Sequence, residues 1–231
     1  MTRTPCHFKA LTQPPRAVYN FSCQKSHTAL NMPDELPAQS RHQPVLAEEV
    51  LQLLLLQSGQ TVVDGTLGGG GHARLFAQRV GGAGRVLGLD RDGNAIAAAR
   101  THLADTIIEP IHANYANLPE VCQQFDVKSV SAVLLDLGLS SDQLASPQRG
   151  FSFRAEGELD MRFDQGRGEP AWKLLSRLNE KHLADLIYEY GEERFSRRIA
   201  RAIVACRRER PVRRSNELAE LISRVVPKSS S

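Results

Sequence analysis

The sequence lacks the features that would place it in a membrane or around a structural metal. Its longest leucine run, Leu53 to Leu56, is far shorter than the ~20 apolar residues that a membrane-spanning helix needs. The four cysteines, at positions 6, 23, 122 and 206, form no Cys-x-x-Cys pair and no cluster with histidine at the spacing of metal ligands. This pattern favours free thiols in a reducing compartment over a disulfide framework or a zinc site. We therefore expect a cytoplasmic protein with no membrane and no metal partner.

The first 41 residues have few acidic residues and no regular apolar pattern. They contain five prolines and no acid before Asp34, a composition that predicts a disordered N-terminal extension over 1–41. The basic, acid-free start weakly resembles an organelle transit peptide, so import into an organelle is the alternative location. Met32 as the true first residue is the simpler interpretation, and we favour it.

A run of four glycines is the most informative feature that the sequence does contain. An apolar strand ends at Asp64 and leads through the segment DGTLGGGGH into a helix. Consecutive glycines are costly on folding unless the backbone adopts positive φ or lets a ligand approach closely. Gly68-x-Gly70-x-x-Ala73 fits the dinucleotide fingerprint, and Asp90 follows Gly68 by 22 residues, the spacing of an acid that binds ribose hydroxyls. We therefore expect a ribose-containing ligand at this loop.

Alternating apolar segments predict an α/β fold with a parallel sheet and helices on both of its faces. We expect strands at 60–64, 85–90, 106–111 and 130–136, and helices at 44–55, 72–80, 93–103 and 116–125, the first of them opening at Pro44. Ligands of such sheets bind outside the carboxyl ends of the strands, where Asp64, Asp90 and Asp136 fall. Beyond position 138 the sequence predicts helices alone, at 170–178, 180–190, 192–209 and 216–225, with Asn179 and Ser215 as N-caps.

Asp136 is the candidate catalytic residue. It ends the fourth expected strand and is followed by Leu-Gly-Leu-Ser-Ser, which places a carboxylate and two hydroxyls at the rim of the expected cofactor site. The alternative is that Asp136 only caps a turn. For Asp64 the structural interpretation is stronger, because an aspartate before a glycine turn often binds the N–H groups of that loop.

One segment holds most of the basic character of the chain. From Arg194 to Arg214 there are nine arginines and one glutamate, although the net charge of the whole chain is only +3. Arg197, Arg198 and Arg201 lie opposite the apolar face of the expected helix, where they would neutralise the phosphates of a nucleic acid. The alternative is a solvated helix face.

A polar loop also carries two aromatic side chains. Phe151 and Phe153, flanked by Arg149 and Arg154, suit stacking on an unpaired base, with the arginines on phosphate. The alternative is that the phenylalanines anchor their own loop to the protein core.

Six motifs together closely resemble those of the bacterial 16S ribosomal RNA cytosine-N4 methyltransferases, also called small subunit methyltransferase H. They are DGTLGGGGH, GLDRD, LLDLGLSSDQL, RGFSF, LDMRFD and YGEERFSRRIARAIV, and the resemblance covers about residues 42–226. It implies a Rossmann-like class I methyltransferase sheet and S-adenosylmethionine, in place of NAD, as the cofactor. It also implies methylation on N4 of a decoding-centre cytidine of 16S ribosomal RNA, with the small ribosomal subunit as partner.

The same resemblance assigns individual residues and domains. The family's cofactor contacts fall on Gly70, Gly71, His72, Asp90, Tyr115, Asp136 and Gln143. Tyr115 stands where we expect phenylalanine, which keeps an aromatic surface for adenine, while Asp142 and Ala145 replace a proline and an acid beside Gln143. The implied domains are a cofactor-binding α/β half-domain at 42–137, a helical RNA-recognition domain at 138–226 and a tail at 227–231.

The resemblance further implies strands that this sequence does not contain. Family members continue with a further strand after the position of Val226, whereas this sequence ends at Ser231. We therefore expect only the first four strands of the sheet and an exposed edge. An inactive cofactor- or RNA-binding remnant is one alternative function, and an NAD-dependent oxidoreductase, allowed by the glycine loop alone, is another. DNA N4-cytosine methylation is disfavoured, because no Asp/Ser-Pro-Pro-Tyr segment follows the fourth expected strand.

Overall fold

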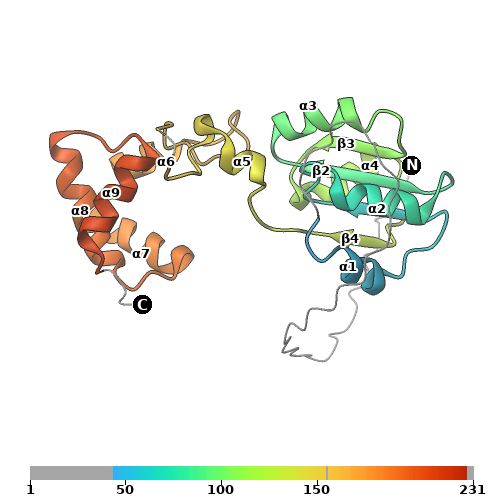
Figure 1. Ribbon diagram of the computed structural model, residues 1–231, viewed down its shortest axis with the longest axis horizontal. Helices are drawn as coiled ribbons and strands as arrows, with labels where there is room; N and C mark the ends of the chain where they lie inside the picture. The colour runs from blue at the N-terminus through green and yellow to red at the C-terminus, as the bar shows by residue number, and fades with distance from the viewer. Residues whose placement is uncertain (1–43, 155, 228–231) are drawn as a thin grey trace, which may run out of the picture. The chain divides into compact units, whose positions relative to one another are not determined.

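The computed structural model describes residues 44–154 and 156–227 (Figure 1). The expected N-terminal extension over 1–41, and all but the first residue of the expected tail, lie outside the described residues. No helix within these two ranges combines the length and the apolar character needed to cross a bilayer. Along the chain, a sheet with its helices comes first, and a run of helices follows.

The sheet has four parallel strands, which confirms the predicted fold class. They are β1 (Thr61–Asp64), β2 (Arg85–Asp90), β3 (Ile108–His112) and β4 (Ala132–Leu134), in the spatial order β3-β2-β1-β4. The chain passes from one side of β1 to the other between β3 and β4, so the topological switch point lies between β1 and β4. In open α/β sheets a ligand crevice forms at that point, outside the carboxyl ends of the strands.

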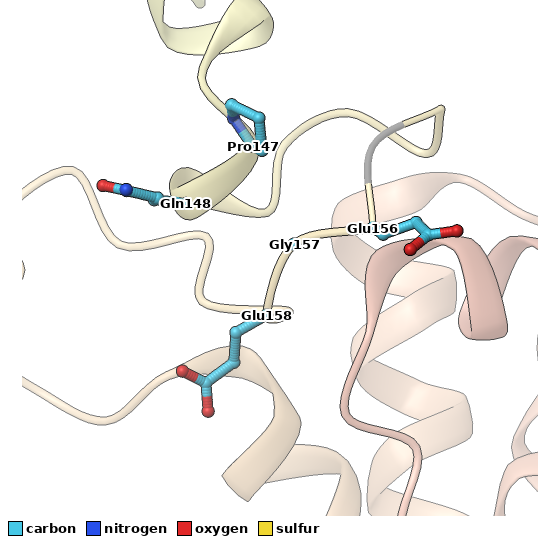
Figure 2. Close-up of a pocket in the computed structure, with 5 residues that line it drawn as sticks. All are labelled: Pro147, Gln148, Glu156, Gly157 and Glu158. Carbon is cyan, nitrogen blue, oxygen red and sulfur yellow. The ribbon is translucent and has the colours of Figure 1, made fainter.

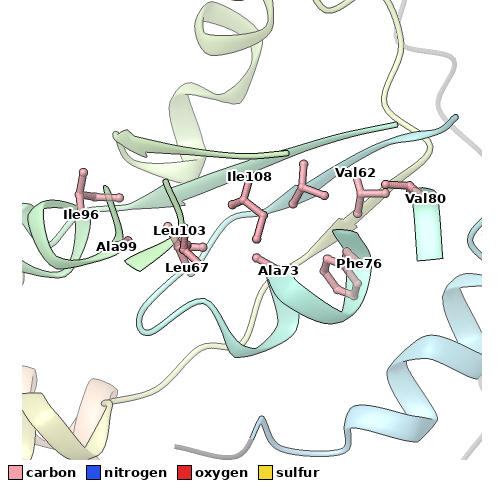
Figure 3. Packing of buried hydrophobic residues seen from close by; sticks show 10 residues of the cluster. Val62, Leu67, Ala73, Phe76, Val80, Ile96, Ala99, Leu103 and Ile108 are labelled. Carbon is pink, nitrogen blue, oxygen red and sulfur yellow. The ribbon is translucent and has the colours of Figure 1, made fainter. Parts of the chain in front are cut away.

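Helices cover both faces of the sheet, because successive strand residues point to opposite sides. On one face lie α1 (Ala47–Leu54), α2 (Gly71–Val80) and α3 (Gly93–His102), packed around a cluster that includes Val62, Phe76 and Leu103 (Figure 3). The other face is covered by α4 (Leu118–Gln124), which follows the 3₁₀ turn η1 (Tyr115–Asn117). The hydrophobic cluster on this second face of the sheet includes Val63, Leu87 and Val121. Fully burying a side chain such as Phe76 stabilises the fold by roughly 1.5–3 kcal/mol.

Two predicted boundaries in this part of the chain are wrong. Pro44 does not open the first helix, which begins at Ala47 after Leu46 has adopted a left-handed φ of 53°. The fourth strand is shorter than predicted, because its last ladder bond joins the N–H of Gly65 to the carbonyl of Leu134 at 2.9 Å. Asp136 then donates its N–H to Thr66 Oγ1 at 2.8 Å, so it lies two residues past the strand.

The helical part begins with two short elements that the sequence did not predict. They are α5 (Ser141–Ala145) and the 3₁₀ turn η2 (Pro147–Arg149). The predicted helices then follow as α6 (Ala171–Arg177), α7 (Glu180–Gly191), α8 (Ser196–Glu209) and α9 (Ser215–Val225). The last three pack around Leu183, Ile199 and Ile203.

The ends of these helices follow local backbone chemistry. Asn179 caps α7 as predicted, since its side chain accepts from the N–H of His182 at 2.8 Å. The helix predicted from residue 192 begins only at Ser196, because Glu192 adopts a φ of 50° and ends α7. Ser215 is the first residue of α9 rather than its N-cap, which corrects the prediction by one position.

Candidate functional site

The glycine loop, residues 64–72, leaves β1 and turns into α2. Gly68 and Gly70 have φ of 49° and 79°, values that favour glycine. The N–H of Leu67 donates to the carbonyl of Leu89 in β2 at 2.8 Å. Leu67 fits there because Gly88 has no side chain, and a Cβ on Gly88 would lie 2.6 Å from Leu67 Cδ1. The glycines therefore serve a tight turn and close packing on the neighbouring strand.

Asp90 joins the glycine loop to the end of β2. Its Oδ2 accepts from the N–H of Gly68 at 2.8 Å, and its Oδ1 accepts from the N–H of Asp92 at 2.8 Å. An ionised carboxylate has about four acceptor positions, so both oxygens keep capacity for the hydroxyls of a ribose. The 22-residue spacing in the sequence thus corresponds to a direct hydrogen bond between loop and acid.

His72 and Asp136 face each other across the switch point. The His72 side chain is buried, and its Nε2 donates to the carbonyl of Val45 at 2.9 Å, which leaves Nδ1 3.8 Å from Asp136 Oδ2. The Asp136 side chain is 44% exposed, so its carboxylate lies at the rim beside the loop. Within the described parts of the chain, no three His, Cys, Asp or Glu side chains gather as a metal site would require.

Tyr115, the first residue of η1, lies beside Gly65, the first glycine of the loop. A Cβ built on Gly65 would lie 3.1 Å from the Cβ of Tyr115 and would clash with the side chain of Leu135. The Tyr115 ring is partly exposed, at 39% for the residue. The structure therefore brings together Gly70, Gly71, His72, Asp90, Tyr115 and Asp136 around one end of the sheet.

Gln143 lies on α5 and faces α3. Its Oε1 accepts from the N–H of Ser140 at 3.0 Å, and its Nε2 donates to Asp92 Oδ2 at 3.0 Å. It lines a cavity of about 220 Å³ between Gly68 and Gly69 of the glycine loop, α3 along its length to His102, and the segment 140–149. Of the seven predicted cofactor residues, Gln143 is the one that lines this cavity.

Two further residues lie at this site: Asp92, which the sequence did not single out, and Arg149, which was expected on a phosphate but is buried against Asp92. Asp92 is the N-cap of α3, and its side chain accepts from the N–H of Asn94. Its carboxylate pairs with the guanidinium of Arg149 at 2.9 Å, and both side chains are at most 6% exposed. Burial raises the pKa of Asp92, but hydrogen bonds from Gln143 and Arg149 outweigh it, so the pKa lies below its usual range. An aspartate before a Gly-Asn helix start was the available signal for the cap.

A second hollow, of about 490 Å³, lies away from the glycine loop. It is lined by Pro147, Gln148, Glu156, Gly157 and Glu158 (Figure 2). Its two glutamates would repel a phosphate, and it contains none of the predicted cofactor or RNA-binding residues. The larger of the two hollows is therefore not the candidate cofactor site.

The predicted RNA-binding residues fall on two surfaces. Phe151 packs on Phe163, with ring centroids 5.4 Å apart, as expected of a phenylalanine that anchors its loop. Phe153 is 66% exposed, and the guanidinium of Arg154 lies 5.9 Å from its ring. On α8, Arg197, Arg198 and Arg201 are all exposed, and Arg201 lies 3.4 Å from Glu180.

Asp64, the last residue of β1, is buried beneath the glycine loop with 1% exposure. Its Oδ1 accepts from the N–H of Thr66 at 3.1 Å, the contact that the structural interpretation predicted. Burial raises its pKa and outweighs both that hydrogen bond and the nearby His72, so the pKa rises from 3.8 to about 6. The carboxylates of Asp90 and Asp136 raise it further.

Comparison with known proteins finds relatives over most of the chain. The model of the MraW methylase family matches residues 39–231. The ribosomal RNA small subunit methyltransferase H of Methylibium petroleiphilum is 45% identical over 190 residues, which cover 80% of this chain and 60% of that protein. The protein of the same name from Nitrosospira multiformis is 42% identical over 187 residues, covering 81% of this chain and 59% of that protein. The chain thus spans about 60% of the length of these relatives.

Among solved structures, a SAM-dependent methyltransferase from Aquifex aeolicus is 25% identical. It is matched over 30% of this chain and 38% of its own, with a TM-score of 0.27.

Asp64 should make the stability of the fold depend on pH. Its folded-state pKa is raised, so the folded protein binds more protons than the unfolded protein between pH 4 and 6, and stability falls as pH rises through that window. The difference of about two pKa units corresponds to on the order of 3 kcal/mol. We expect urea unfolding of Asp64→Asn to lack this decline, while the exposed control Asp105→Asn keeps it. Parallel pH profiles for the wild type and Asp64→Asn would contradict the raised pKa.

Proposed function

Because the chain belongs to the MraW methylase family, we propose that it acts in S-adenosylmethionine-dependent N4-methylation of a decoding-centre cytidine in small-subunit ribosomal RNA. Its relatives named above are ribosomal RNA small subunit methyltransferases H. The hydrogen bond between Gly68 and Asp90 supports the proposal most directly, because it joins the glycine loop to an acid that would accept from a ribose at the carboxyl end of the sheet. A ribosomal substrate also supports a cytoplasmic location.

The residues at the site fit this cofactor. A Cβ on Gly68 would meet only the carbonyl of Thr66, at 4.0 Å, so the loop leaves space for a ligand against its backbone. Asp90 keeps acceptor capacity for the ribose, and Tyr115 offers an aromatic face for the adenine. Gly70, Gly71 and His72 would surround the amino acid moiety, and Gln143 would approach from α5. The bound cofactor supplies an activated methyl group on its sulfonium.

Asp136 is the residue that we assign to the target amine. The lone pair of a cytosine N4 is conjugated with the ring and therefore weakly nucleophilic. A carboxylate that accepts a hydrogen bond from N4 holds the amine in line with the methyl group, and such positioning supplies much of the rate. The N–H of Asp136 is fixed by Thr66 Oγ1 at 2.8 Å, while its carboxylate is exposed beside His72. Asp136 therefore has a backbone held in place by Thr66 and a carboxylate that a substrate amine can reach.

The RNA would reach this site with its target base unstacked, because the reacting nitrogen must be reached directly. Exposed Phe153, with Arg154 over its ring, provides a stacking surface for a neighbouring base. The exposed arginines of α8 provide phosphate contacts. Phe151, packed on Phe163, would support this loop from within.

Calorimetric titration tests the cofactor assignment and separates it from an NAD enzyme. We expect the chain to bind S-adenosylmethionine and to give no heat of binding with NAD. Asp90→Asn should weaken binding about tenfold or more, because a hydrogen bond to a charged acceptor is lost. Asp105→Asn, an exposed control, should bind as the wild type does. Tighter binding of NAD, or an unchanged affinity in Asp90→Asn, would overturn the assignment.

Methyl transfer to small ribosomal subunits tests the role of Asp136. We expect Asp136→Ala, and the matching substitution in a full-length relative, to lose at least about 100-fold in kcat at saturating cofactor. Asp105→Ala serves as the control for loss of an exposed carboxylate. Near-normal turnover in the relative's variant would rule out this role for the aspartate.

The salt dependence of RNA binding tests the arginine face of α8. Replacing Arg197, Arg198 and Arg201 together by glutamine removes up to three phosphate contacts, so the slope of log K against log salt should decrease by about 2 for single-stranded RNA. The charge-matched control replaces the exposed Arg79, Arg100 and Lys128 by glutamine. Equal slopes for the two triple variants would show that α8 makes no specific contribution.

A further inference from the structure

Arg149, at the end of η2, is a buried arginine that contacts two separate segments of the chain. Its Nη1 donates to Asp92 Oδ1 at 3.0 Å, and its Nη2 forms an ion pair with Asp92 Oδ2 at 2.9 Å. Its Nη2 also donates to the carbonyls of Arg162 and Phe163, at 3.1 and 2.7 Å. The arginine is 5% exposed and Asp92 3%, so solvent does little to screen the interaction.

Asp92 transmits this contact to the residues that we propose for the cofactor. Its N–H donates to Asp90 Oδ1 at 2.8 Å, and Asp90 Oδ2 accepts from Gly68. Its own Oδ2 accepts from Gln143 Nε2 at 3.0 Å. The position of the Asp92 carboxylate therefore affects Asp90, the glycine loop and Gln143 together.

On its other side, Arg149 holds the loop that carries the predicted base-stacking residues. This recognition loop consists of residues 150–154 and 156–163. The guanidinium lies 6.0 Å from the Phe151 ring, which packs on Phe163, whose carbonyl Arg149 binds. Phe153 and Arg154 follow directly in the chain.

We propose that Arg149 is a positioning residue that couples the recognition loop to the cofactor site through Asp92, so that ordering of one favours ordering of the other. This inference rests on the proposed function. Its specific requirement is the planar guanidinium, because a lysine keeps the charge but cannot pair with both carboxylate oxygens and reach two carbonyls at once.

The Arg162–Asp160 pair provides a matched control. It is a close ion pair too, with hydrogen bonds of 2.8 Å from Nε to Oδ1 and from Nη2 to Oδ2, and it lies in the same loop. Neither side chain lines the cavity beside the glycine loop. Arg162→Lys keeps the backbone carbonyl that accepts from Arg149, so loss of this pair reports on loop stability while the Arg149–Asp92 contact stays in place.

The test compares Arg149→Lys with Arg162→Lys in the full chain. By calorimetry with S-adenosylhomocysteine, we expect about a tenfold loss of affinity in the first variant and less than about a twofold loss in the second. By hydrogen exchange without ligand, amides of residues 64–72 should exchange faster in Arg149→Lys alone. Ligand should slow exchange in the recognition loop of the wild type and of Arg162→Lys, but not of Arg149→Lys. Equal affinities, or equal exchange at the glycine loop in both variants, would overturn the proposal.

A second variant keeps the test decisive if Arg149→Lys does not fold. The double variant Asp92→Asn with Arg149→Gln removes both buried charges and keeps polar groups at both positions. We expect it to fold and to bind S-adenosylhomocysteine about tenfold more weakly than the wild type. Wild-type affinity in the double variant would contradict the coupling. Failure of the wild type itself to bind would count against the proposed function, while the exchange comparison would still test the network.

Discussion

The buried carboxylate of Asp92 is the constraint on which the arrangement at the carboxyl edge of the sheet depends. An ionised group with 3% exposure is tolerated only when its charge is paired and its lone pairs are used. The guanidinium of Arg149, the amide of Gln143 and the N–H of Asn94 meet that demand. Segment 140–149 must therefore lie against the start of α3, which closes one side of the candidate site.

The other side of the candidate site is formed by the glycine loop, which packs closely on the ends of β1 and β2. Gly88 leaves room for Leu67, and the positive φ of Gly68 and Gly70 turns the chain back toward α2. Asp90 then accepts the N–H of Gly68, and Thr66 fixes the backbone of Asp136. The sheet topology, the glycine turn and the aspartates Asp64, Asp90 and Asp136 thus all lie at the carboxyl edge of the sheet, where the switch point between β1 and β4 is found.

Local sequence patterns predicted the sheet and much of the candidate site. The features that were not predicted depend on contacts between residues far apart in the sequence. The alternation of strand and helix segments predicted a parallel sheet, and the 22-residue spacing from Gly68 corresponds to a hydrogen bond to Asp90. The Asp92–Arg149 pair joins residues 57 positions apart, and no local motif signals it. The end of the fourth strand was misplaced for the same reason, because Asp136 bonds to Thr66, 70 residues away. No local pattern distinguishes anchored Phe151 from exposed Phe153, because Phe151 is held by its contact with Phe163.

In the function that we propose, the glycine loop and Asp90 together bind an adenosyl cofactor. Amide chemical shifts of ¹⁵N-labelled protein, followed during titration with S-adenosylhomocysteine, test it most directly. We expect the largest shifts at Gly68, whose N–H bonds to Asp90, and at Thr66 and Asp92. Amides of Gln148, Gly157 and Glu158, at the hollow in Figure 2, should stay unchanged. Shifts confined to that hollow, or none at the glycine loop, would contradict a cofactor site at the glycine loop and Asp90.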